Sequence, residues 1–175
     1  MSFMEPFKSP DDLHLDAAED WLEKGNVMEA NSGLNRVSPA LRRHPDLLAV
    51  RYKVLAQAEC WTECVAVAAA IIKIAPHSSL GWLQQSHALH QLKQIRMAME
   101  TLLPALKVFR DEIEIHRRVA LYDCVLGNLN RAKQRLAETI QLAREQKCVD
   151  ECRQAILNEP GLKPFWKMLD APASA

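Results

Sequence analysis

The sequence predicts an all-α fold, an α-solenoid built from antiparallel helix pairs. A small residue recurs at intervals of 34 residues, in a column formed by Ala30, Cys64, Ala98 and Ala132. Because a small side chain lets two helices approach closely, this recurrence marks the same contact in successive hairpins. Turn residues recur between the amphipathic stretches, and only five glycines and 6% aromatic residues argue against a β-sandwich.

The amino-acid composition argues against some classes of binding partner. Lys plus Arg equals Asp plus Glu at 22 each, so the chain has no net charge to attract nucleic acid or an anionic membrane. The most apolar stretch, 64–75, contains Lys73 and is too short to span a bilayer. The amino-terminal residues do not resemble a signal peptide, and five cysteines do not form a secreted disulfide framework. We therefore expect a cytoplasmic protein with neither a nucleic-acid nor a membrane partner.

Capping residues predict the first helices. Pro10 with the following acids begins the first helix, and Gly25 ends it. Asn26 with Glu29 forms a capping box for the second, in which Gly33 and Pro39 predict a bend or fraying. The third helix begins at Pro45–Asp46, the fourth at Trp61, and the fifth after the cap His77–Ser78–Ser79.

The remaining helices are expected over 95–109, 113–126 and 129–146. Pro104 predicts a kink in the helix expected over 95–109. Asp111 with Glu114 predicts a capping box for the helix expected over 113–126. Gly127–Asn128 predicts a turn before the helix expected over 129–146. Further columns at the same interval support this register: Ala18, Tyr52, Ser86 and Ala120 on the first helices, Gly25, Glu59, Lys93 and Gly127 at the turns, and Leu34, Ala68, Leu102 and Leu136 on the second helices.

These columns resemble the tetratricopeptide repeat (TPR) family, with the stretch 119–132 as the best single match. Trp82 and Pro76 also stand where that family often has these residues, whereas Tyr52 replaces a small residue and Asp123 an aromatic one. The resemblance implies a right-handed superhelix of four repeats plus a cap. The expected division is an arm 1–10, repeats 11–44, 45–78, 79–112 and 113–146, a capping helix with a short helical segment 147–169, and a frayed tail 170–175.

The resemblance also implies a concave groove lined by the first helix of each repeat. Such a groove binds a peptide or protein segment, so the chain is expected to be a non-catalytic adaptor without a cofactor. The residues expected to bind the partner are Lys53, Gln57, Gln84, His87, His90, Gln91, Arg117, Arg118 and Leu121. Their amides and cations suit a backbone together with an acidic side chain or chain terminus. Solvated helix faces without a partner remain the simpler interpretation.

The stretch 64–75 offers a different hypothesis because it is apolar on almost every side. Ala66, Val67, Ala70 and Ile74 would form its outer face, and a covered outer face predicts self-association, such as a homodimer. A bacterial secretion-type chaperone is a further alternative, although such chaperones tend to be acidic.

A third hypothesis is a metal or Cys–His site. His87 and His90 lie one helical turn apart, and Cys124 is equivalent to His90 in the next repeat. Three such side chains supply ligands for zinc or a nucleophile with its base. Histidines without a catalytic role are the simpler interpretation, and the chain contains no phosphate-binding loop, nucleophile elbow or HExxH motif.

Overall fold

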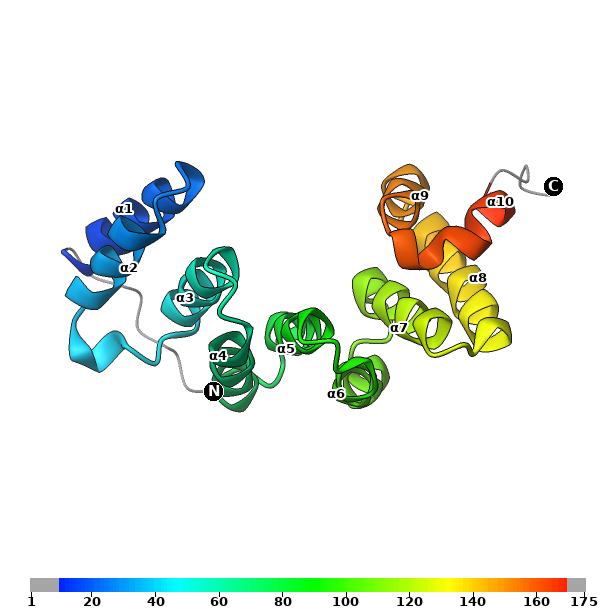
Figure 1. The fold of residues 1–175 in the computed structure, drawn as a ribbon, viewed down its shortest axis with the longest axis horizontal. Coiled ribbons are helices and arrows are strands. Elements are labelled where there is room, and N and C mark those ends of the chain that lie inside the picture. Colours follow the sequence, from blue (N-terminus) through cyan, green and yellow to red (C-terminus); the bar gives the residue numbers. More distant parts are fainter. Residues whose placement is uncertain (1–9, 170–175) are drawn as a thin grey trace. The chain divides into compact units, whose positions relative to one another are not determined.

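The computed structural model describes residues 10–169, and in this range it contains helices and no strands. Figure 1 shows the order of these helices along the chain. Their bounds are α1 Asp11–Glu23, α2 Val27–Arg36, η1 Pro39–Leu41, α3 Pro45–Gln57, α4 Trp61–Ile74, α5 Ser79–Gln91, α6 Ile95–Val108, α7 Ile113–Val125, α8 Leu129–Glu145, α9 Val149–Leu157, η2 Pro160–Phe165 and α10 Trp166–Leu169.

The residues of the 34-residue columns are buried as predicted. Every member of the small column, from Ala30 to Ala132, is fully buried, and so is every member of the column from Leu34 to Leu136. The turn column is equally regular, because Gly25, Glu59, Lys93 and Gly127 all have positive φ. Each of these residues ends the first helix of a pair in the left-handed conformation, which directs the chain into the second helix.

The helices separate into two compact units, one up to Leu92 and one from Lys93 onward. In unit 1, α1 packs against α2, α3 against α4, and α4 against α5, while α1 also contacts α3. A Cβ on Gly33 would lie 3.2 Å from the Ala18 Cβ, so this glycine permits the close approach of α2 to α1. The sequence predicted a bend or fraying in this second helix. In the structure α2 ends at Arg36 and is followed by the short 3₁₀ helix η1.

Unit 2 contains α6 to α10. Here α7 packs against α6 and α8, and η2 contacts both α7 and α9. Asp123 is fully buried on α7, where its carboxylate accepts a hydrogen bond from Arg135 Nε at 2.9 Å and lies 3.5 Å from Arg131 Nε. A charged network therefore ties α7 to α8 at the position where the resemblance led us to expect an aromatic residue.

The start of α7 differs from the sequence-based prediction. Glu112 is the N-cap residue and no side chain caps this helix, so the predicted capping box of Asp111 and Glu114 is wrong. The Glu114 carboxylate is instead bound by Arg117 and Arg118 on the next turn of the helix. Two guanidinium groups hold a carboxylate more strongly than a backbone N–H does, which explains the difference.

Candidate functional site

Residues 34 apart lie side by side on the first helices of unit 1. Lys53 Nζ on α3 donates a hydrogen bond to Glu19 Oε1 on α1, at 2.9 Å. Both side chains are about half exposed, at 55% and 44%. Neighbouring first helices therefore present equivalent positions to one surface, as the repeat register predicts.

A hydrogen-bonded network joins α3 to α5. The Tyr52 hydroxyl donates to the backbone carbonyl of Gln84 at 2.8 Å and lies 3.0 Å from His87 Nδ1. The second ring nitrogen, His87 Nε2, lies 3.1 Å from Gln91 Nε2. A neutral His87 with its proton on Nδ1 satisfies both contacts, because it donates to Tyr52 and accepts from Gln91. The Trp61 ring packs against His87 edge to face, so the imidazole is held in place.

The predicted partner-binding residues of unit 1 differ in exposure. Lys53, Gln57 and Gln91 are exposed, whereas His87 and His90 are half-buried. The side-chain oxygen of Gln84 is buried and accepts no hydrogen bond from the described part of the chain. We call the surface of Glu19, Lys53, Gln57, His87 and Gln91 the first-helix face of unit 1.

In unit 2, the two arginines predicted to bind the partner, Arg117 and Arg118, form ion pairs with Glu114 of the same helix. Arg117 donates two hydrogen bonds to the Glu114 carboxylate, at 2.8 and 2.7 Å, and Arg118 donates one at 2.6 Å. Burial alone would raise the pKa of Glu114, but its bonds to Arg117 and the two guanidinium charges hold this pKa below its ordinary value. These cations therefore neutralise a carboxylate of their own unit.

The segment η2 covers the same side of α7. Leu121 is only 2% exposed, and a Cβ added to Gly161 would overlap Leu121 Cδ1. Glu159 Oε2 lies 3.6 Å from Arg117 Nη1. The structure thus places Arg117 and Leu121 in contacts within unit 2 rather than on an open surface. The sequence suggested a carboxy-terminal cap but did not show which residues it covers.

The apolar face proposed for self-association is largely packed within unit 1. Val67 is half-buried against the core cluster of Tyr52, Cys64, Ala68 and Ala88, and Ala70 and Ile74 are half-buried as well. Among these four residues only Ala66 is exposed. The apolar character of α4 is explained by its packing against both α3 and α5.

Nothing in the described part of the chain supports the hypothesis of a metal or Cys–His site at His87, His90 and Cys124. Among residues 10–169, no group of three or more His, Cys, Asp or Glu side chains is placed to hold a metal ion. Both ring nitrogens of His87 already have neighbours, and burial raises the pKa of the Cys124 thiol. A thiol with a raised pKa is a poor nucleophile near neutral pH. Nor is any helix in the described part of the chain long and apolar enough to cross a membrane.

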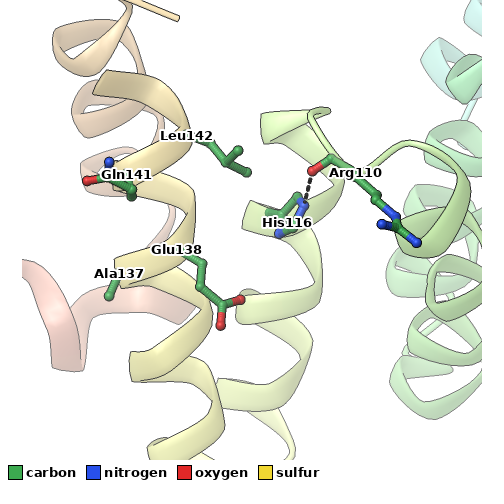
Figure 2. Close-up of a pocket in the computed structure, with 6 residues that line it drawn as sticks. All are labelled: Arg110, His116, Ala137, Glu138, Gln141 and Leu142. Atoms are coloured by element: carbon green, nitrogen blue, oxygen red, sulfur yellow. Dashed lines mark hydrogen bonds between the residues drawn. The ribbon is translucent and has the colours of Figure 1, made fainter. Parts of the chain in front are cut away.

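An open surface pocket of about 530 Å³ lies between α7 and α8 and was not predicted from the sequence. Figure 2 shows that Leu142 and Glu138 on α8 face His116 on α7, whose Nε2 bonds the Arg110 carbonyl oxygen at 2.7 Å. The signal in the sequence is that His116 stands 34 residues after Trp82, so a smaller ring occupies the equivalent position. The walls are mainly apolar.

Comparison with known proteins shows the fold alone. No protein-family model matches the chain, and no curated protein is similar to it in sequence. A double mutant of MamA from strain RS-1 of Desulfovibrio magneticus is 16% identical, with a TM-score of 0.69 over 80% of this chain and 79% of that one. Another MamA structure is 11% identical, with a TM-score of 0.65 over 94% and 98%.

A thermophilic TPR protein of Thermus thermophilus is 15% identical to this chain. Its TM-score is 0.61, and the match covers 91% of this chain and 94% of that one. The chain therefore has an all-helical fold of the TPR type, and the prediction of a solenoid of antiparallel helix pairs is confirmed.

Proposed function

We propose that this chain is a protein-interaction adaptor whose first-helix face in unit 1 binds an extended polypeptide segment. The observation that carries the proposal is the Lys53–Glu19 ion pair, because it joins two equivalent positions of adjacent repeats across a shared surface. Proteins of this fold generally act as non-catalytic scaffolds for other proteins, and stacked helix pairs create long binding surfaces.

The chemistry of the face favours a neutral, polar segment over an acidic one. Lys53 is paired with Glu19, so the face has no unpaired cation at this position. Gln57 and Gln91 are exposed and carry amide groups that both donate and accept hydrogen bonds. A peptide backbone offers the matching N–H and C=O groups at regular intervals.

Two exposed amides provide the experimental test. The double variant Gln57→Arg with Gln91→Arg replaces the proposed contacts by bulky cations on exposed positions, so the fold should persist. We expect this variant to capture the native partner at least about tenfold less than the wild type, which corresponds to about 1.4 kcal/mol. Circular dichroism checks that its helix content is unchanged.

The matched control carries the same substitutions on another face of unit 1. Thr62 and Ala69 are both exposed on α4, and the double variant Thr62→Arg with Ala69→Arg should capture the partner as the wild type does. Equal capture by both double variants would exclude the first-helix face as the binding surface.

A further inference from the structure

The surface pocket between α7 and α8 has no part in the proposed function. Its volume of about 530 Å³ is within the range of about 300–1,000 Å³ that is typical of small-molecule sites. The residues that line it are Arg110, His116, Ala137, Glu138, Gln141 and Leu142. All of them belong to unit 2, whereas the first-helix face belongs to unit 1. The pocket is therefore a separate candidate site.

The imidazole of His116 is a fixed part of the pocket wall. Its Nε2 donates a hydrogen bond to the Arg110 carbonyl oxygen at 2.7 Å, because a carbonyl can only accept. Its Nδ1 is buried and has no hydrogen-bond partner in the described part of the chain, so Nε2 alone anchors the ring. Leu142 on α8 faces this ring (Figure 2). The two side chains together give the pocket a flat, mainly apolar wall.

The repeat register indicates which shape of ligand suits this wall. The residue 34 positions before His116 is Trp82. An indole is larger than an imidazole by one six-membered ring, and the pocket adjoins the imidazole. A ligand with an aromatic ring would therefore restore the size of the side chain that the preceding repeat carries at this position.

The charge in the wall selects the sign of the ligand. Figure 2 shows that the Glu138 carboxylate projects from α8 toward α7, whereas the Arg110 guanidinium points away from His116. Arg110 Nε donates to the Lys107 carbonyl oxygen at 3.4 Å. Glu138 accepts a hydrogen bond from Gln134, and no ion pair neutralises it within the described residues. A positively charged group of a ligand therefore fits beside Glu138.

We propose that this pocket binds a small aromatic amine, with its ring against His116 and Leu142 and its ammonium group beside Glu138. Burial of the ring supplies the attraction, and the carboxylate fixes which end of the ligand lies at α8. The volume suffices for a ring with a short alkylamine chain. The occupant is therefore a free small molecule and not an extended polypeptide segment.

Titration of the full chain with tryptamine, followed by saturation-transfer difference NMR, tests the site. We expect saturable binding to the wild type with a Kd on the order of 1 mM, as for a small ligand in an open pocket. Indole-3-propionate carries the same ring with a carboxylate in place of the amine. Since Glu138 should repel this anion, we expect it to bind at least about threefold more weakly than tryptamine.

Glu138→Gln and Glu145→Gln are matched variants on α8. Each of these exposed glutamates accepts a hydrogen bond from the glutamine four residues before it, but only Glu138 lines the pocket. Glu138→Gln should weaken tryptamine binding about threefold and remove the preference for the amine over the acid. Glu145→Gln should bind both compounds as the wild type does.

The variant His116→Trp fills the pocket with an indole of the chain itself and should abolish tryptamine binding. Circular dichroism checks that its helix content is unchanged, and the two glutamate variants decide the question if this one does not fold. Four results would each overturn the proposal: no saturable binding of tryptamine to the wild type, equal affinity for tryptamine and indole-3-propionate, equal effects of the two glutamate substitutions, or undiminished binding to a folded His116→Trp variant.

Discussion

Asp123 is a single residue whose charge holds two helices together. Its fully buried carboxylate accepts a hydrogen bond from Arg135 on α8, and Arg131 lies beside it. The substitution Asp123→Ala removes the buried acceptor of Arg135, whose side chain is only 21% exposed, whereas Arg131 is 60% exposed and remains in contact with water. We expect it to lower the free energy of unfolding by about 3 kcal/mol, measured by urea denaturation.

Glu138→Ala is the control for this substitution. Glu138 is exposed on α8 and accepts one hydrogen bond from Gln134, so its loss should cost less than about 0.5 kcal/mol. Similar losses for the two variants would show that burial of the charged network does not matter to stability.

The five cysteines differ in burial, and this difference predicts their reactivity. Cys64, Cys124 and Cys152 are buried and burial raises the pKa of each thiol, whereas Cys60 and Cys148 are half-buried. Because the thiolate is the reactive form, we expect iodoacetamide to modify Cys60 and Cys148 first. Mass spectrometry after short labelling times measures the order, and early modification of Cys64 would contradict it.

Cys64 also predicts how stability depends on pH. Burial, followed by the neighbouring Cys60 and Glu63, raises the pKa of Cys64 from 9.0 to about 11. Between these values the unfolded chain releases the proton and the folded chain keeps it, so stability falls as the pH rises. Replacing Cys64 with Ala should remove this part of the alkaline decline in Tm, and an unchanged decline would argue against it.

Tyr52 shows what sequence reasoning missed at the scale of a residue. The repeat register placed it on the packed side of a first helix, where a small residue is expected. The structure shows that its ring is buried while its hydroxyl reaches Gln84 and His87 on α5. The hydroxyl at the end of this large side chain forms hydrogen bonds with another helix, and the spacing of residues in the sequence does not show with which residues it does so.

At the scale of the element, the left-handed turn residues are predicted to limit stability. Glu59 and Lys93 have φ of 56° and 63°, in a conformation that strains side chains with a Cβ. Gly25 and Gly127 occupy the equivalent turns without this strain. We expect Glu59→Gly to raise the free energy of unfolding by about 0.5–1 kcal/mol, measured by denaturant titration.

The neighbouring Ala58 provides the control in the same turn. Its φ is −81°, which is relaxed for any residue, so Ala58→Gly only adds freedom to the unfolded chain. It should lower stability by about 0.5–1 kcal/mol. Destabilisation by Glu59→Gly of the same size would show that the left-handed turn is not strained.

The contact of η2 with α7 provides a second prediction at this scale. Because a Cβ at position 161 would overlap Leu121 Cδ1, Gly161→Ala must push η2 away from α7 or shift the end of this buried side chain. We expect a loss of about 1–3 kcal/mol in unfolding free energy. Lys163→Ala, an exposed change in the same segment, should be nearly neutral. Stability unchanged by Gly161→Ala would mean that η2 does not pack closely on α7.

The helices themselves were largely predictable, and the contacts of the last segment were not. Periodicity, caps and turn residues are local signals, and Asn26, Ser78 and Gly127 act at the positions expected from them. The packing of Gly161 against Leu121 joins residues far apart in the sequence, and nothing local specifies it. The capping box at Glu114 failed for a different reason, because two nearby arginines compete for the carboxylate.

At the scale of the whole molecule, one interval of 34 residues accounts for the helix pairs, their buried columns and the alignment of the first helices in unit 1. The sequence predicted this register because small, turn and apolar residues recur together. The sequence did not predict which charged residues of the proposed surface are paired, since ion pairs such as Lys53–Glu19 and Arg117–Glu114 form only after folding. Those pairs are why we favour a neutral partner over the acidic one expected from the residues.

The most direct test is photo-crosslinking in the native cell from single positions in the full chain. A photoreactive amino acid at Gln57 or Gln91 reports what touches the first-helix face, and the same group at Ala69 on α4 is the control. The account predicts a crosslink to one polypeptide segment from both Gln57 and Gln91 and none from Ala69. Crosslinks to a polypeptide from Ala69 alone would contradict it.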